Sequence, residues 1–403
     1  GLFRQRFEDG RQVETPEDWL LKRNPWEFER PEAAYTIGFK GSVETKGGKA
    51  VWLPGETVTA TAHDTPVVGW KGKWANTLRL WAAQPTTLLD LARFNRGDYT
   101  AAAEPETLAR TISRVLYPDD TTFAGKELRL KQEFFLTSAA LQDILRRFLD
   151  THKDLTKLPE KVAIQMNDTH PAIAGPELIR LLVDGHGMAF DPAREIAQKV
   201  LGYTNHTLLP EALERWSTYL VGTVLPRHMQ IIEQIDHWHL DEHHSRPHWV
   251  GIVKNHEVRM GELAFIMSHK VNGVSALHTE LVKKTLFPEL DALHPGRIVN
   301  QTNGVTPRRW LRMANPALSR LITSTIGEGW EADLDRLKGL EKHVGDKAFR
   351  HAFGQAKLAN KVATAKWIAD HTGVIVDPDA MFDVQVKRIH EYKRQLLNIL
   401  ETI

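Results

Sequence analysis

The spacing of apolar residues divides the chain into two kinds of region. Up to about residue 100, apolar and polar residues alternate over short stretches at 34–39, 57–62 and 76–81, a period that is typical of β-strands with one buried face. Beyond that point, apolar residues recur at helical spacing, and the longest such segment predicts a helix over 128–148. Short strands interleaved with helices predict a protein of the α/β class.

Two short apolar runs are each followed by a polar loop that contains asparagine and histidine. Residues 162–166 resemble a buried strand, and an Asn-Asp-Thr-His-Pro string follows at 167–171, with its threonine as the expected helix cap. Residues 199–201 precede a Tyr-Thr-Asn-His-Thr string at 203–207 in the same way, ahead of a helix expected over 210–224. Loops at strand ends carry ligand contacts in open α/β sheets, and a structural histidine is the alternative for each loop.

Near the end of the chain, a strand pattern changes into a helix pattern through a basic junction. Residues 382–386 alternate as a strand does, and residues 389–400 have helical spacing. A strand that leads into a helix through cations is suited to binding an anion, because the helix start also offers free N–H groups. A solvated charged helix face is the alternative. The junction contains Lys387, Arg388, His390, Lys393 and Arg394.

Histidines crowd one polar segment, but the sequence favours a surface loop there over a metal site. The segment lacks a His-Glu-x-x-His frame, and Pro247 and charged residues indicate a loop. His390-Glu391 also fails that test, because Arg394 stands where the second histidine would be. We therefore predict no metal site. The histidines of the segment are His237, His239, His243, His244, His248 and His256.

Length and charge narrow the classes of function. A chain of 403 residues is too long for one compact core, so we expect two domains. Lysine and arginine number 52 against 51 acidic residues, which argues against a nucleic-acid-binding protein. The chain has no cysteine, no apolar run of membrane-spanning length and no signal-peptide core at its start, so we expect a cytoplasmic protein. It starts without methionine and ends inside a helical pattern, so we expect both ends to be cuts within a longer protein.

Several separated strings, in this order and spacing, resemble the α-glucan (glycogen, starch, maltodextrin) phosphorylases. The resemblance covers essentially the whole chain, and strings of this length are highly specific. They are Arg-Val-Leu-Tyr-Pro at 114–118, Gly-Lys-Glu-Leu-Arg-Leu-Lys-Gln-Glu at 125–133, the two histidine strings at 167–171 and 203–207, Leu-Pro-Arg-His at 225–228, Val-Asn-Gly-Val at 271–274, and residues 302–310 and 383–398.

The resemblance implies a fold of the glycosyltransferase B type, with two Rossmann-like domains that face each other across a cleft. The N-terminal, glucan-binding domain would cover residues 1–302 without its own beginning. The C-terminal domain, which binds cofactor and phosphate, would start at 303 and be truncated at 403. The implied reaction is reversible phosphorolysis of terminal α-1,4-glucosyl units to glucose 1-phosphate, with retained configuration.

Motif by motif, the resemblance also implies roles for residues that contact the sugar. His206 and Asn303 match contacts to the sugar, especially to its 6-hydroxyl group, and His206 is one of the expected catalytic residues. Asp168 and His170 match residues that line the sugar subsite. Asp120 lies in the segment that matches the family's gate loop beside that subsite, although Thr121 stands where animal members have asparagine.

The other implied roles concern phosphate and cofactor. Arg388 and Lys393 match the catalytic cations that hold the substrate phosphate, and Tyr392 matches a residue that touches the bound glucose. Lys387 matches a position beside the phosphate of pyridoxal 5′-phosphate, and Trp310 matches a residue near that coenzyme. The implied partners are the glucan, inorganic phosphate and a second copy of the chain in a homodimer, with no nucleic acid and no membrane.

Two functions of other classes remain as alternatives. A glycoside hydrolase with Asp168 as its acid or base would need a second carboxylate nearby. It would not depend on phosphate, so an activity assay with and without phosphate distinguishes a hydrolase from a phosphorylase. A non-catalytic carbohydrate-binding or assembly fragment would bind maltodextrin without turnover. A nucleic-acid-binding module around Lys387–Arg394 conflicts with the formal net charge of +1.

We expect the isolated 403-residue polypeptide to be inactive. The family's coenzyme lysine and a nearby glutamate belong to a later segment that this chain does not contain, and the Gly-rich loop against the sugar phosphate would precede residue 1. A phosphorolysis assay on maltodextrin should therefore detect no glucose 1-phosphate, with a full-length enzyme as the positive control. Release above the enzyme-free blank would contradict this expectation.

Overall fold

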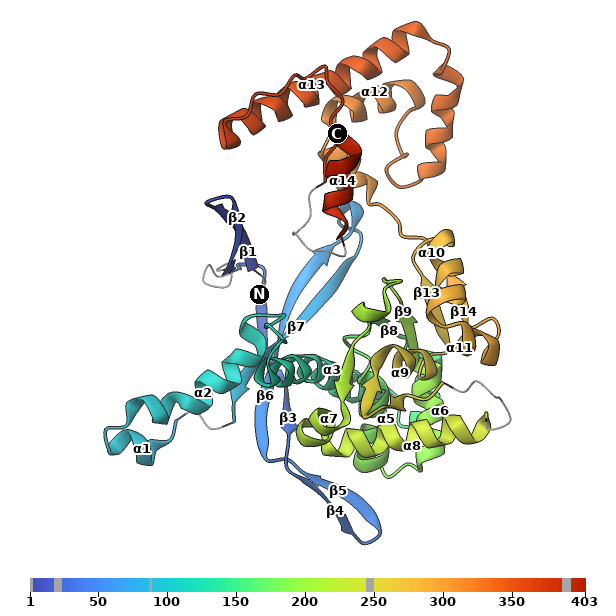
Figure 1. Ribbon diagram of the computed structural model, residues 1–403. Coiled ribbons are helices and arrows are strands. Elements are labelled where there is room, and N and C mark those ends of the chain that lie inside the picture. The colour runs from blue at the N-terminus through green and yellow to red at the C-terminus, as the bar shows by residue number, and fades with distance from the viewer. Residues whose placement is uncertain (1–2, 18–23, 87–88, 244–249, 386–392) are drawn as a thin grey trace. The chain divides into compact units, whose positions relative to one another are not determined.

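The computed structural model describes residues 3–17, 24–86, 89–243, 250–385 and 393–403. The chain forms two compact units, Gly1–Thr302 and Asn303–Ile403 (Figure 1). The first unit contains antiparallel sheets, one parallel sheet and helices that pack against them. The α/β class predicted from the sequence is therefore confirmed.

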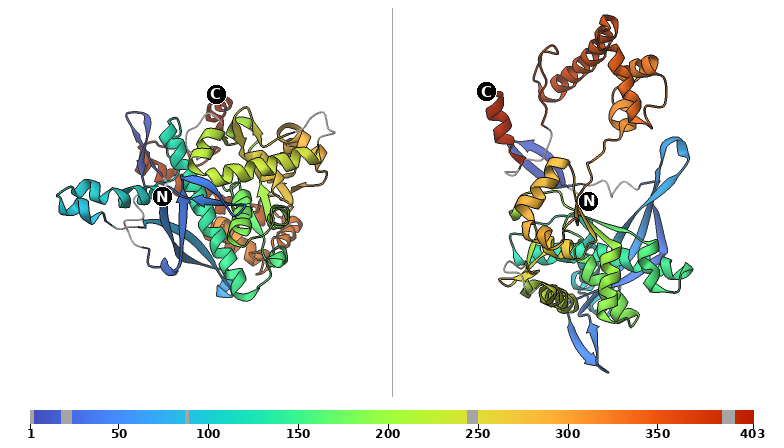
Figure 2. Two further views of the ribbon diagram at one scale, coloured as in Figure 1. Left: turned by 90° about the horizontal axis from the view of Figure 1, so that it is seen from below. Right: turned by 90° about the vertical axis from the view of Figure 1, so that its right-hand side faces the viewer.

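The first unit begins with antiparallel strands. β3 (Phe28–Phe39), β6 (Glu56–Val68) and β7 (Ala75–Pro85) form one sheet in the order β3-β6-β7, and the three predicted strands lie inside them. Alternate residues of β6, such as Ala60 and Ala62, are fully buried. Two hairpins accompany this sheet: β1 (Phe3–Glu8) with β2 (Arg11–Pro16), and β4 (Ser42–Lys46) with β5 (Lys49–Leu53). The β4–β5 hairpin projects from the end of the sheet (Figures 1 and 2).

The long helix predicted over 128–148 is α3 (Phe123–Thr151). It starts earlier than its apolar pattern suggests because Thr122 caps it, with Oγ1 accepting from the backbone N–H of Gly125 at 3.1 Å. One face packs against β3 and another against α5 (Ala174–Arg180). The helix therefore joins the antiparallel sheet to the α/β part of the unit.

Four short parallel strands form the second sheet of the first unit. Its order is β14 (Ile298–Asn300), β13 (Lys270–Gly273), β9 (Leu201–Thr204) and β8 (Ile164–Asn167). Every neighbouring pair is parallel, so the carboxyl ends of all four strands share one edge. Helices α5 and α6 (Phe190–Val200) connect β8 to β9.

The connection from β9 to β13 is longer and contains a small antiparallel sheet of order β10-β12-β11. The remaining elements of the unit are α1 (Leu91–Asn95), α2 (Tyr99–Arg114), α4 (Leu158–Lys161), β10 (Arg215–Ser217), α7 (Thr218–Val224), α8 (Pro226–Glu242), β11 (Val253–Lys254), β12 (Glu257–Arg259), α9 (Met260–Ile266), α10 (Ala276–Leu281) and α11 (Pro288–Leu293).

Three local predictions in this unit are wrong. The helix expected over 210–224 is split, because residues 215–217 pair as β10 with β12 before α7 begins. Thr169 does not cap α5, because its hydroxyl group donates to Glu214 instead. The predicted histidine-rich surface loop is partly a helix: His239 lies in α8 and is only 1% exposed.

The described part of the second unit is helical. A π-helical turn, Arg308–Met313, leads to α12 (Pro316–Ile326), a 3₁₀ stretch, Leu334–His343, and then α13 (Lys347–Thr372) and α14 (Gln395–Thr402). The strand expected over 382–386 is not formed across residues 382–385, and Val386 lies outside the described residues. A strand needs a neighbouring strand to pair with, and the described residues from 303 onward contain no strand.

Among the residues that the structure describes, no helix combines the length and the hydrophobicity needed to cross a bilayer.

Three helices of the first unit meet at one buried carboxylate. Glu177 on α5 is fully buried and accepts from Ser138 Oγ of α3 at 2.6 Å and from His228 Nε2 of α8 at 2.7 Å. Arg180, one turn later on α5, donates to the same carboxylate at 2.6 and 2.8 Å. Burial by itself would raise the pKa of Glu177, but the Arg180 charge and these hydrogen bonds lower it to about 2.

We predict that Glu177→Ala lowers the free energy of unfolding by about 3–5 kcal/mol, because it leaves Arg180 and two hydrogen-bond donors buried without their acceptor. Urea unfolding at neutral pH measures this loss. Glu233→Ala is the matched control, since Glu233 is exposed on α8, and should change stability by less than about 0.5 kcal/mol. Equal stability of the two variants would show that the carboxylate does not join the helices.

Candidate functional site

The two histidine loops singled out in the sequence meet at the carboxyl edge of the parallel sheet. β8 ends at Asn167, and the loop after the neighbouring strand β9 carries His206. Nε2 of His206 lies 2.6 Å from Oδ1 of Asn167. This contact orients the imidazole ring at the edge where open α/β sheets bind ligands.

Asp168 is held in place by its own backbone. Its φ of 65° lies in the left-handed region, which aspartate tolerates better than most residues. Its N–H donates to the carbonyl of Thr204 on β9 at 3.0 Å, and its Oδ1 accepts from the N–H of Thr169 at 2.7 Å. The carboxylate is therefore pre-positioned beside the two loops.

A cluster of charged residues connects this edge to the loop before α3. Thr169 donates from Oγ1 to Oε2 of Glu214 at 3.0 Å, and Arg129 donates to the other oxygen of Glu214. Arg129 also donates to Asp120 at 2.6 Å. The predicted gate-loop residue Asp120 is thus linked, through two side chains, to the threonine next to Asp168.

The same cluster places one guanidinium among three carboxylates. Besides Asp120 and Glu214, Arg129 faces Glu133, whose Oε1 lies 3.4 Å from Nε. Burial raises the pKa of Glu133 well above its ordinary value, and the adjacent Glu214 carboxylate raises it further. Glu133 therefore keeps a proton at a pH at which an exposed glutamate has lost it.

His170 lies against the loop that follows α2. Its ring and that of Tyr117 meet edge to face, with centroids 5.8 Å apart. Tyr117 has a φ of 55°, so the backbone turns sharply just before Pro118. The structure thus brings Asp120, Asp168, His170 and His206 into one connected region of the first unit.

A third loop at this edge was not assigned a role from the sequence. Asn272 on β13 accepts from Thr204 Oγ1 at 2.8 Å, and its carbonyl accepts from the N–H of Asn205 at 3.0 Å. His278, at the start of α10, has a pKa lowered first by burial and also by its neighbour His206. A signal was available in the sequence, because Ser275, a good cap residue, follows the string Val-Asn-Gly-Val at 271–274 and precedes a helix.

The remaining predicted residues belong to the second unit. Asn303 opens it, Trp310 lies on the π-helical turn with 68% of its surface exposed, and Lys393 precedes α14. Lys387, Arg388 and Tyr392 lie outside the described residues.

Glu214 is not free to serve as the second carboxylate that a glycoside hydrolase requires. Glu214 is the carboxylate connected to the residue next to Asp168, but it is only 8% exposed. Both of its oxygens are engaged, one by Arg129 and the other by Thr169. It is therefore poorly placed to exchange protons with a bound glycoside.

The family model described as Carbohydrate phosphorylase matches residues 1–403. Glycogen phosphorylase of Haemophilus influenzae is 46% identical to the chain over 413 residues, which cover 100% of this chain and 50% of that protein. Alpha-glucan phosphorylase, H isozyme, of Triticum aestivum is 45% identical, with 100% and 51% coverage. The liver form of glycogen phosphorylase of Homo sapiens is 44% identical, with 100% and 50% coverage. The chain spans about half the length of these curated relatives.

The raised pKa of Glu133 predicts a pH-dependent stability. A carboxyl group whose pKa is raised by folding contributes stability below its unfolded pKa, and this contribution is lost as the pH rises through the folded value. Glu133→Gln, whose amide needs no proton, should match the parent protein near pH 5 and become progressively more stable than it towards about pH 9. Thermal unfolding across this range measures the difference.

The control for this experiment is Glu233→Gln on the exposed face of α8, which should follow the parent protein at every pH. A Glu133→Gln profile parallel to the parent profile would show that Glu133 is ionised in the folded protein.

Proposed function

Because the chain belongs to the carbohydrate phosphorylase family over residues 1–403, we propose that it is part of an α-glucan phosphorylase. Such an enzyme catalyses a reversible phosphorolysis. Inorganic phosphate attacks the terminal α-1,4-glucosyl unit of a glucan, and glucose 1-phosphate is released with retained configuration. The names of the relatives, glycogen phosphorylase and alpha-glucan phosphorylase, support this assignment.

The observation that carries the proposal is the polar edge of the parallel sheet. A neutral sugar is recognised by directional donors and acceptors, and Asp168, His170 and His206 offer them within one connected region. The contact from Asn167 to His206, at 2.6 Å, fixes the imidazole that would meet the sugar 6-hydroxyl group. Asp120, held by Arg129, would border the same subsite from the loop before α3.

The second unit would supply the phosphate-binding side of the site. Arg388 and Lys393 would hold the substrate phosphate as fixed cations, which suits a reaction that has an anionic nucleophile. Tyr392 and Asn303 would complete the sugar contacts. In this proposal the two units correspond to the two Rossmann-like domains of a glycosyltransferase B fold.

The family implies pyridoxal 5′-phosphate, and the described residues are compatible with it. Trp310 presents an exposed indole ring, suited to packing against a flat heteroaromatic group, and the exposed Arg309 next to it offers a cation to a phosphate. Trp310 and Lys387 would hold the coenzyme. When bound, the coenzyme phosphate supplies a proton relay, so no pair of catalytic carboxylates is needed.

The wider setting of the enzyme is also a proposal. By analogy with the family, the full-length protein would be a cytoplasmic homodimer that acts on glycogen, starch or maltodextrin. The near balance of 52 basic and 51 acidic residues fits a neutral polymeric substrate better than a polyanion.

We predict that His206→Ala and Asn167→Ala, made in the full-length enzyme, each lower kcat/KM for phosphorolysis of maltodextrin by about ten- to hundredfold. This is the loss expected when one well-placed hydrogen bond to a substrate is removed. His206→Ala removes the sugar contact, and Asn167→Ala removes the group that orients it, so the two effects should be less than additive in the double variant.

The matched control is His186→Ala, because His186 is exposed at the end of the π-helical turn after α5 and lies outside the site. It should leave kcat/KM unchanged. Parent-like activity of His206→Ala would show that the sheet edge is not part of the substrate site. Release of sugar product without added phosphate would show that the enzyme is a hydrolase and not a phosphorylase.

A further inference from the structure

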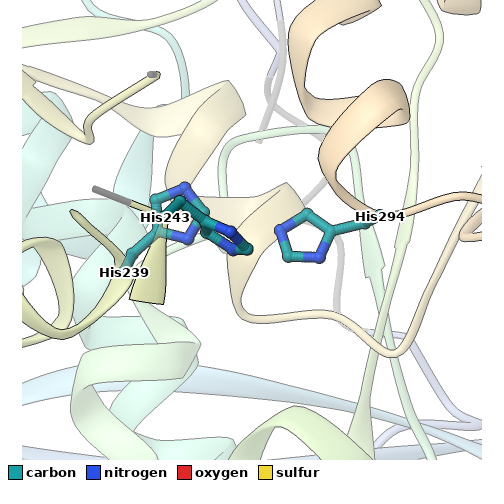
Figure 3. A group of neighbouring side chains, drawn as sticks. All are labelled: His239, His243 and His294. Carbon is teal, nitrogen blue, oxygen red and sulfur yellow. The ribbon is translucent and has the colours of Figure 1, made fainter. Parts of the chain in front are cut away.

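Three histidines from two separate segments converge inside the first unit. His239 lies in the last turn of α8, His243 is the C-cap residue of the same helix one turn later, and His294 is the C-cap residue of α11. Figure 3 shows the His294 ring directed towards the two rings from α8. The potential ligand nitrogens all lie within 4.8 Å of one another.

Four of the six ring nitrogens of this cluster have no hydrogen bond of good geometry among the described residues. These are both ring nitrogens of His239, and Nε2 of His243 and of His294, and all four are buried; the Val250 backbone is close enough to act as a hydrogen-bond partner of the His239 ring. His239 is only 1% exposed. A buried polar atom without a partner costs about 1–3 kcal/mol, so several such atoms in one place indicate a missing ligand.

The spacing fits a divalent transition metal ion. Residues four apart on a helix lie on the same face, so His239 and His243 can chelate one ion, and His294 adds a third imidazole. Nitrogens bound to tetrahedral Zn²⁺ at about 2.0–2.1 Å lie roughly 3.3 Å apart. Small side-chain rotations would bring the three nitrogens to that distance, and water would take the fourth position.

The charges around the cluster have opposite effects on a cation. The guanidinium of Arg297 lies over the Phe265 ring next to His294, and its positive charge disfavours a bound cation. Glu242 lies close enough to Arg297 to offset part of that charge. The C-terminal end of α8, where His239 and His243 lie, carries the negative end of the helix dipole and favours a cation.

We propose that His239, His243 and His294 form a binding site for a Zn²⁺-like transition metal ion that ties the end of α8 to the end of α11. The sequence analysis predicts no metal site here, because the segment lacks a His-Glu-x-x-His frame and resembles a surface loop, and because His294 is distant from it in the chain. The ion would bind one nitrogen of each ring and stabilise the first unit, independently of the chemistry at the sheet edge.

The test is metal binding by the untagged protein after treatment with EDTA. Titration calorimetry should show one high-affinity Zn²⁺ per chain, and Mg²⁺ should not compete, because it prefers oxygen ligands. His294→Gln should weaken Zn²⁺ binding at least tenfold, whereas His237→Gln, an exposed histidine of the same helix, should leave it unchanged. Equal affinity of all three proteins, or no stoichiometric binding by the parent, would overturn the proposal.

A second measurement does not depend on any variant. Co²⁺ bound to the parent protein should give the strong visible absorption of a tetrahedral site, and Zn²⁺ should displace it. Zn²⁺ should also raise the Tm of the parent protein and of His237→Gln, but not that of His294→Gln. Weak octahedral absorption together with an unchanged Tm would count against a three-histidine site.

Discussion

Parallel pairing of β8 and β9 is the constraint on which the proposed site depends. Because neighbouring parallel strands end at the same edge, the loops after them must meet, although Asn167 and His206 are 39 positions apart in the chain. The 2.6 Å contact between Asn167 and His206 is a direct consequence of that pairing. β13 joins the same edge and brings Asn272 and His278 to it.

Two clusters of buried ionic groups support the sheet edge, and their charges are paired to different degrees. Glu177 is satisfied by Arg180, Ser138 and His228, so it is a stable anion that fixes three helices relative to one another. Around Arg129 the balance is different, since three carboxylates face one guanidinium and Glu133 must keep its proton. The first cluster holds the framework, and the second connects the loop containing Asp120 to the threonine beside Asp168.

The histidine cluster at the ends of α8 and α11 differs from both ionic clusters. His228 donates to Glu177 through Nε2, whereas Nε2 of His239, His243 and His294 has no hydrogen bond of good geometry with a described residue. Together with the convergence of rings from two segments, this lack of partners favours a metal ligand set over ordinary core packing.

The sequence by itself determined the fold class, the three strands of the antiparallel sheet, helix α3 and the loops that carry Asp168, His170 and His206, because alternation and helical spacing are local properties. It also contained the strings that indicate the family. Tertiary structure decided what depends on partners distant in the chain: residues 215–217 became a strand only because β12 pairs with them, and Thr169 bonds Glu214 rather than capping α5. Burial of His239 and its approach to His294 likewise follow from the packing of α8 and α11, which no local pattern specifies.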